Sequence, residues 1–124
     1  MKLLLIDDNK DITTMFSKYF TQKGHSCSIC NNAQNGLNMI TTGQYDVVLL
    51  DLAMPEFSGT DIVDALYKSG KIAKLNIVAL TASSISVDNE EHLKKMGVRS
   101  VLKKPIDPDE LLDYLRQFDL KLVQ

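Results

Sequence analysis

Short apolar runs without polar interruptions alternate along the chain with segments whose apolar residues recur every three or four positions. The three clearest runs are residues 2–6, 46–50 and 76–80. Apolar runs of this length, unbroken by polar residues, indicate strands buried on both faces, as in a parallel sheet. Two less apolar segments, 25–30 and 98–103, complete a set of five predicted strands.

A segment with helical spacing follows each predicted strand. Residues 11–24 are the clearest, because they carry one apolar face and end at Gly24, a frequent helix terminator. That face consists of Ile12, Met15, Phe16, Tyr19 and Phe20. The other predicted helices are 32–43, 59–70, 84–96 and 107–118. The last begins with Asp107 as its N-cap and Pro108 in its first turn, which is a favourable start.

Strand and helix therefore alternate five times, which predicts a single α/β domain over residues 1–124. Its doubly wound, five-stranded parallel sheet is expected to carry helices on both faces, joined by right-handed crossovers. The segment 84–96 has few apolar anchors, chiefly Leu93 and Met96. We therefore expect it to be the least stable helix and the one most able to move.

The composition is typical of soluble globular proteins, with a net charge of −2. A nucleic-acid-binding surface would need a clustered basic excess, and no apolar run is long enough to span a bilayer. The apolar stretch from Leu3 to Ile6 is followed at once by two aspartates, unlike the core of a signal peptide. We expect a cytoplasmic protein that binds neither a membrane nor, directly, nucleic acid.

Cys27 and Cys30 form a C-x-x-C pair, a spacing also found in zinc and redox sites. They fall on a predicted strand, however, where residues three apart face opposite sides of the sheet. The sequence contains no second C-x-x-C to complete a zinc site. We interpret the pair as two ordinary thiols in a reducing compartment.

Polar residues stand where four of the predicted strands end. Asp7 and Asp8 follow the first strand, and Asp51 ends the third. Thr81 ends the fourth strand and Lys104 the fifth. Because open parallel sheets bind ligands beyond the carboxyl ends of their strands, we expect these side chains to meet at one sheet edge. The charge that ends a buried strand at Asp51 then faces a pocket.

Three neighbouring carboxylates repel one another, and a divalent cation would relieve that repulsion. All the candidate ligands are oxygens, so a hard ion such as Mg²⁺ fits best. Lys104 and Thr81 add an ammonium and a hydroxyl that a metal site alone does not need. A phosphoryl group between the metal, the lysine and the hydroxyl would use every one of these side chains. Taken singly, a strand-end aspartate is usually only a cap or turn residue.

The motifs that carry these residues resemble those of response-regulator receiver domains, the phosphoacceptor half of two-component signalling. They are IDDN (6–9), LLDLAMPEFSG (49–59), LTA (80–82) and KKP (103–105), and the resemblance covers essentially the whole chain. It implies the flavodoxin-like form of the predicted fold.

The resemblance also implies a role for each acidic residue. Asp51 would accept a phosphoryl group from a phosphohistidine. Asp8 and Asp51 would bind Mg²⁺ directly, and Asp7 mainly through water. The backbone carbonyl of Ala53 would complete the protein's share of the ligands.

Two further residues would contact the phosphoryl group, Thr81 through its hydroxyl and Lys104 through its ammonium. The bond before Pro105 is expected to be cis, an inference that belongs to the resemblance alone. Ala82 matches a position that is kept small, so that phosphodonors reach the acceptor. One departure stands out, because many receivers carry an aromatic residue three positions before the lysine and this chain has Val101 there.

The expected partners are a histidine kinase or phosphotransfer protein and a downstream protein target. The target would bind through residues 84–96, the fifth strand and the last helix. Because the chain stops soon after that helix, we expect a stand-alone receiver. It would not be an enzyme, apart from assisting its own phosphorylation and dephosphorylation.

Two alternatives remain open. A magnesium-dependent aspartyl-phosphate phosphatase of the haloacid-dehalogenase type would need a second aspartate two residues after Asp51, where this chain has Ala53. A pseudo-receiver that binds partners without phosphorylation would have lost one of the acids or the lysine, and all of them are present.

Overall fold

The computed structural model describes residues 1–54, 56–82 and 85–119, which form one parallel sheet with helices on both faces. Its strands run in the order β2-β1-β3-β4-β5. They are β1 (Lys2–Ile6), β2 (Ser26–Cys30), β3 (Val47–Asp51), β4 (Ile77–Thr81) and β5 (Ser100–Lys103). The predicted five-stranded, doubly wound α/β fold is therefore confirmed, with strand boundaries shifted by no more than two residues.

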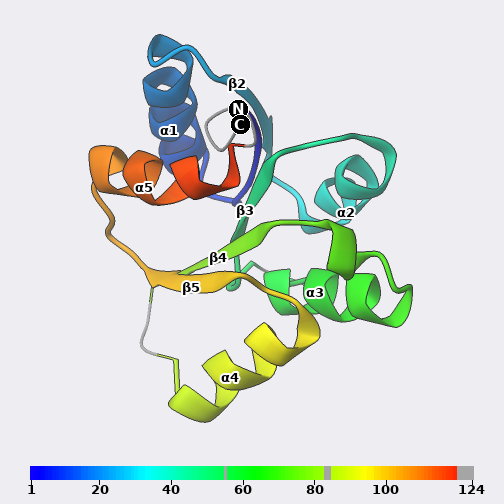
Figure 1. Ribbon diagram of the computed structural model, residues 1–124. Coiled ribbons are helices and arrows are strands. Elements are labelled where there is room, and N and C mark those ends of the chain that lie inside the picture. The colour runs from blue at the N-terminus through cyan, green and yellow to red at the C-terminus, as the bar shows by residue number, and fades with distance from the viewer. Residues whose placement is uncertain (55, 83–84, 120–124) are drawn as a thin grey trace.

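Five α-helices connect or follow these strands (Figure 1). They are α1 (Lys10–Gln22), α2 (Ala33–Thr42), α3 (Gly59–Lys68), α4 (Val87–Met96) and α5 (Pro108–Leu115). Short 3₁₀ turns, Ile72–Lys74 and Arg116–Phe118, precede β4 and follow α5. The first residue of the predicted helix 84–96, Ser84, lies outside the described residues.

Each face of the sheet buries its own apolar core. Alternate side chains of one strand point to opposite faces, so Leu3 and Leu5 belong to the core beneath α1 and α5, while Leu4 and Ile6 belong to the core beneath α2, α3 and α4. Figure 1 shows α1 and α5 together on one side of the sheet and the other three helices on the opposite side. Burial on both faces explains why β1, β3 and β4 are continuous apolar runs.

The helix ends follow the polar residues of the sequence. Asn9 caps α1 by accepting from the amides of Asp11 and Ile12. Asp107 caps α5 in the same way, with Pro108 in the first turn as predicted. Such caps satisfy amides that lack a partner within the helix. They fix where each helix begins relative to the strand before it.

The buried face of α1 differs in one position from the predicted one. Met15 is 47% exposed, whereas Thr13 is buried in line with Phe16 and Phe20. Thr13 shares the i, i+3, i+7 stripe of the two phenylalanines, and its hydroxyl is satisfied by hydrogen bonds. The helical spacing therefore predicts the buried face correctly, but Thr13, a polar residue, is buried on that face and Met15 is not.

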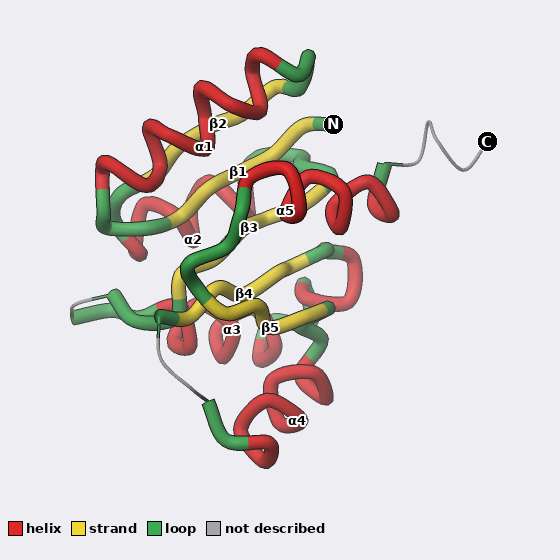
Figure 2. Tube along the Cα trace, turned by 90° about the vertical axis from the view of Figure 1, so that its left-hand side faces the viewer, coloured by secondary structure: helices red, strands yellow, loops and turns green. Residues whose placement is uncertain are grey.

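The helix α4 is the least anchored, as its sequence predicts. Leu93 is the only residue of α4 that is buried, and Val87 at its start is 69% exposed. Figure 2 shows α4 at the lower edge of the molecule, beyond β5 and α3. A helix held by so few apolar contacts is a low-stability element that can shift at small cost.

The two cysteines lie on opposite sides of β2, as predicted. Cys30 is buried in the core on the α2 side, whereas Cys27 packs at the border of the core under α1. Both thiols are free. Burial raises the pKa of Cys27 to about 11, which keeps it protonated at neutral pH. Among the described residues, no helix is long and apolar enough to cross a membrane.

Candidate functional site

Three aspartates meet where β1 and β3 end. Parallel pairing sets Ile6 beside Leu50, so the residues that follow, Asp7 and Asp51, leave adjacent strands at the same level. Asp7, Asp8 and Asp51 each offer a carboxylate oxygen within 4.8 Å of the other two. Asp7 and Asp51 are only 4% and 5% exposed, whereas Asp8 is open to solvent. The predicted meeting of these acids at one sheet edge is therefore found.

Lys104 reaches into this cluster from the segment after β5. Its Nζ lies 2.6 Å from Asp7 Oδ2 and 3.6 Å from Asp51 Oδ1. The backbone amide of Lys104 donates to the carbonyl of Thr81 at 2.7 Å, and this bond holds the segment after β5 against the end of β4. The peptide bond to Pro105 is cis, as the resemblance implied. One ammonium thus pairs with two of the three carboxylates, and the cluster keeps a net negative charge.

The surroundings of Asp51 raise the pKa of its carboxyl group. Burial raises its pKa above the ordinary value of 3.8, and the charges of Asp7 and Asp8 act in the same direction. The Ala53 amide, which donates to Asp51 Oδ1 at 3.2 Å, and the Lys104 ammonium lower the pKa. The ionised form of Asp51 is therefore disfavoured in the bare protein, and a cation or a neutralising reaction at this carboxylate would relieve that cost.

Thr81 occupies the neighbouring position at the same sheet edge. The register of β3 and β4 pairs Asp51 with Leu80, so Thr81 lies one residue further towards the acidic cluster. It is 7% exposed. Ala82 follows Thr81 and is exposed, and its side chain is only a methyl group.

The loop after Asp51 returns closely over the strand end. A Cβ on Gly59 would lie 2.1 Å from the carbonyl oxygen of Asp51, so no other residue fits at this start of α3 without moving the backbone. Ser58 and Asp61 close a capping box around the same turn. The start of α3 is thereby held directly against the backbone of Asp51.

The donor set fits a hard divalent cation. Three carboxylates and one ammonium leave two negative charges in excess, and all the candidate ligand atoms are oxygens. Mg²⁺ prefers oxygen ligands and commonly takes one or two carboxylates while it retains water. The acidic cluster is therefore chemically suited to Mg²⁺.

Two residues that the sequence did not single out hold the loop between β1 and α1. Asn31, just after β2, donates to the carbonyl of Asp7 and to the hydroxyl of Thr13. The i, i+3, i+7 spacing of Thr13 with Phe16 and Phe20 was a signal that it is buried. Asn31 gave no such signal, because an asparagine after a strand is an ordinary turn residue.

Among the pockets of the described residues, two bear on the location of the site. One, of about 370 Å³, borders the acidic cluster and is mostly apolar. Its lining consists of Ile12, Met15, Phe16, Ala82, Lys104, Pro105 and Ile106. It explains why Met15 is exposed, because this side chain forms part of an open wall.

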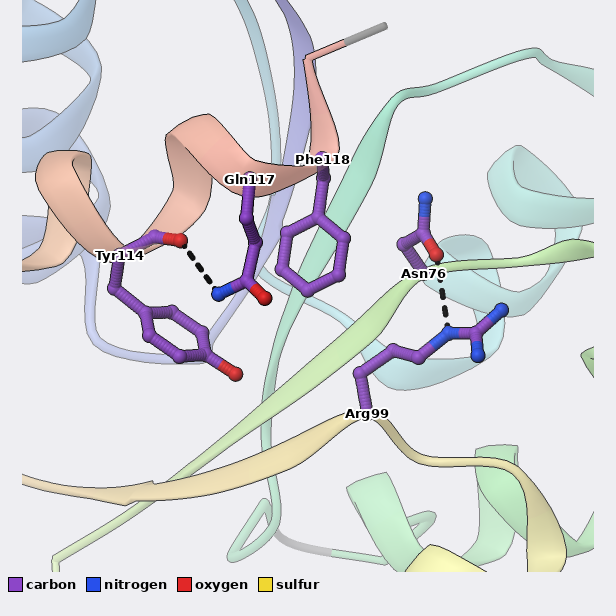
Figure 3. A pocket seen from close by; sticks show the side chains of 5 residues that line it. All are labelled: Asn76, Arg99, Tyr114, Gln117 and Phe118. Atoms are coloured by element: carbon purple, nitrogen blue, oxygen red, sulfur yellow. Dashed lines mark hydrogen bonds between the residues drawn. The ribbon is translucent and has the colours of Figure 1, made fainter. Parts of the chain in front are cut away.

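The second pocket, of about 430 Å³, lies at the opposite edge of the sheet, where Asn76 and Arg99 immediately precede β4 and β5. Figure 3 shows Tyr114 of α5 and Gln117 and Phe118 of the 3₁₀ turn after it on the other side of the pocket, with Arg99 donating to the side chain of Asn76. None of the acidic cluster lines this pocket, so it takes no part in the chemistry of the site.

Comparison with known proteins identifies the family to which this chain is similar. Residues 3–116 match the family model of the response regulator receiver domain. The transcriptional regulatory protein DltR of Streptococcus agalactiae is 34% identical over 116 residues, and CusR of Escherichia coli is 32% identical. Each match covers 94% of this chain and 50% of the relative, so the chain spans about half the length of these curated relatives.

Solved structures share the whole fold. The receiver domain of the Francisella response regulator 1452 superposes with a TM-score of 0.86 at 26% identity, covering 98% of both chains. The response regulator TrrA of Thermotoga maritima, solved in complex with Mg²⁺-BeF, superposes with a TM-score of 0.78 at 26% identity. That match covers 95% of this chain and 99% of TrrA.

Proposed function

The chain belongs to the family of response regulator receiver domains, and from that premise we propose that it accepts one phosphoryl group on Asp51 in a Mg²⁺-dependent reaction. The observation that carries the proposal is the position of Asp51. Its carboxylate ends the central strand β3, is almost fully buried, and lies 3.6 Å from the Lys104 ammonium. Two further acids flank it within 4.8 Å.

The chemistry is a transfer between two nucleophiles. A carboxylate oxygen of Asp51 attacks the phosphorus of a phosphohistidine, so a phosphorus–oxygen bond forms and the phosphorus–nitrogen bond breaks. The departing imidazole keeps the bonding electron pair and takes up a proton. Lys104 then offsets the negative charge on the phosphoryl oxygens, and the Thr81 hydroxyl donates a hydrogen bond to one of them.

Asp7, Asp8, Asp51 and the backbone carbonyl of Ala53 are the proposed ligands of Mg²⁺, with Asp7 acting mainly through water. When bound, the ion neutralises charge that develops on the transferred group. The chain's own contribution is to hold these oxygens together at one sheet edge. The pKa of Asp51 is raised chiefly by burial and also by the charges of Asp7 and Asp8, so a cation bound at this carboxylate would offset a cost that the bare site carries.

The same site argues against a phosphatase. Residue 53 is an alanine, so the position two residues after Asp51 offers no carboxyl as a general acid. The phosphoryl group would therefore remain on Asp51 until water removes it, and the protein would act as a signalling switch. A pseudo-receiver is also disfavoured, because all three acids are present within 4.8 Å of one another and Lys104 pairs with two of them.

The proposed partners are a histidine kinase or phosphotransfer protein as the donor and a protein target in the cytoplasm. We place the target surface on α4, β5 and α5. The helix α4 supports this, because it is weakly anchored and begins with the exposed apolar residue Val87. Residues 1–124 would act as one unit in both contacts.

Incubation with acetyl phosphate and Mg²⁺, followed by intact-protein mass measurement, tests the proposal. The wild-type protein should gain the mass of one phosphoryl group, and Asp51→Asn should gain none. Asp64→Asn is the matched control, because Asp64 is a partly exposed acid on α3 that pairs only with Lys68 among the described residues. An Asp51→Asn protein that is phosphorylated at the wild-type rate would remove the proposal.

A further inference from the structure

The side chain of Asn31 links the end of β2 to a stretch of chain about twenty residues earlier, the turn after β1 and the start of α1. Asn31 follows the last residue of β2. Its Nδ2 lies 2.7 Å from the backbone carbonyl oxygen of Asp7 and 3.0 Å from Thr13 Oγ1. Asp7 belongs to the turn between β1 and α1, which carries both acids, and Thr13 lies in the first turn of α1. The amide group of one residue after β2 therefore bonds to the start of the turn that presents the two acids and to the helix that follows it.

Thr13 extends this link into the start of α1. It is 1% exposed, and its hydroxyl donates to the carbonyl of Lys10 at 3.2 Å while it accepts from Asn31. Displacing Asn31 would take its amide donor from the buried Thr13 hydroxyl and from the carbonyl of Asp7, so these hydrogen bonds resist displacement. The first turn of α1 is thereby fixed relative to the end of β2.

The orientation of the Asn31 amide follows from its partners. A backbone carbonyl accepts hydrogen bonds but cannot donate them, so the atom that faces Asp7 must be the nitrogen. That nitrogen carries two hydrogens, one for each of its two acceptors. Replacement by aspartate would turn a carboxylate towards the carbonyl of Asp7, and replacement by alanine would leave that carbonyl and the Thr13 hydroxyl without this donor.

We propose that Asn31 is a positioning residue that sets the Mg²⁺ affinity of the site by fixing the backbone of Asp7, and through it the direction of the Asp8 carboxylate. The proposal rests on the function proposed above. Residues that orient metal ligands from outside the coordination sphere typically change metal affinity by about 10–100-fold when they are removed. Asn31 touches neither the ion nor the phosphoryl group in this role, so its effect should appear in metal binding before it appears in chemistry.

Mg²⁺ titration followed by the backbone amide signals of Asp8 and Asn9 measures this effect directly. We expect Asn31→Ala to raise the Mg²⁺ dissociation constant by about tenfold or more. Thr13→Val, which removes the hydroxyl but keeps the shape, should weaken binding in the same direction. Thr13→Ser keeps the hydroxyl and should restore affinity close to the wild-type value.

Asn32→Ala is the matched control. Asn32 is the adjacent asparagine, but its side chain caps α2 by accepting from the amide of Asn35. It makes no such bond to the turn between β1 and α1 that carries Asp7 and Asp8. Its replacement should lower the melting temperature without changing Mg²⁺ affinity. If Asn32→Ala weakens Mg²⁺ binding as much as Asn31→Ala does, general destabilisation explains the effect and the proposal is wrong.

The rate of phosphorylation by acetyl phosphate separates this proposal from the function it rests on. At saturating Mg²⁺, Asn31→Ala should reach at least half of the wild-type rate, while at low Mg²⁺ it should fall behind. A wild-type protein that binds Mg²⁺ but is never phosphorylated would refute the proposed function and leave the role of Asn31 standing. Unchanged Mg²⁺ affinity in Asn31→Ala, or a wild-type protein that binds no Mg²⁺, would overturn the role of Asn31.

Discussion

Replacing Gly59 with alanine is expected to damage the site through one backbone contact. The added Cβ would lie 2.1 Å from the carbonyl oxygen of Asp51, whereas real Cβ atoms essentially never approach another atom closer than 3.0 Å. The difference between these distances is 0.9 Å, and the atom in the way belongs to the backbone. Because no side chain can rotate aside, either the end of β3 or the start of α3 must move by about that amount.

Two opposing terms set the size of the effect on stability. Alanine favours helix over glycine by about 1 kcal/mol, whereas overpacking of a fixed contact costs roughly 1–3 kcal/mol or more. We expect a net loss of up to about 2 kcal/mol, or a fall of up to roughly 8 °C in the melting temperature for a domain of this size. A misplacement near 1 Å at a reacting group costs on the order of 10²-fold in rate, so phosphorylation should suffer more than stability.

Thermal melting and the initial rate of phosphorylation by acetyl phosphate measure both effects. Gly70→Ala is the control, because Gly70 has a positive φ of 74° but open space around its Cβ position, far along the chain from the site. That variant should lose stability through backbone strain of about 1–2 kcal/mol and keep the wild-type rate. If Gly59→Ala melts at the wild-type temperature and is phosphorylated at the wild-type rate, the close approach of α3 to Asp51 is not a constraint on the site.

Three further outcomes are expected. Asp8→Ala should weaken Mg²⁺ binding in an NMR titration, and unchanged binding would show that this acid is not a ligand. Because folding raises the pKa of Asp51, the wild-type protein loses stability as pH rises through that pKa. Without metal, the melting temperature of Asp51→Asn should therefore exceed that of the wild type by an amount that grows from acidic to neutral pH. Mg²⁺ should reduce this difference in melting temperature. Since Val101 is stiff and short, beryllofluoride with Mg²⁺ should shift the amides of residues 85–92 more than those of 100–103, and the reverse pattern would refute this account of the switch.

The fold could be predicted because both of its periodicities are strong. The continuous apolar runs of β1, β3 and β4 reflect burial on both faces, and each of these strands ends within one residue of its predicted end. The prediction was less accurate for α4 and β5. Few residues of these two elements are buried. The apolar pattern therefore predicts that each element exists but not the residue at which it begins.

The acidic cluster was also predictable, because topology alone brings the strand ends of a parallel sheet to one edge. The pairing of Lys104 with both Asp7 and Asp51 follows from that placement and the attraction of opposite charges. The role of Asn31 could not be predicted in the same way. Its contacts depend on the exact path of a turn and on a hydroxyl in another element, and neither leaves a periodic signal in the sequence.

The most direct test of the central claim is to locate the phosphoryl group on the chain. After reaction with acetyl phosphate and Mg²⁺, borohydride reduces an acyl phosphate to the corresponding alcohol, and peptide mass spectrometry identifies the altered residue. We predict that the modification lies on Asp51 alone and disappears when Mg²⁺ is chelated before the reaction. Modification of Asp7 or Asp8 in its place, or none on any aspartate, would contradict the assignment of Asp51 as the phosphoacceptor.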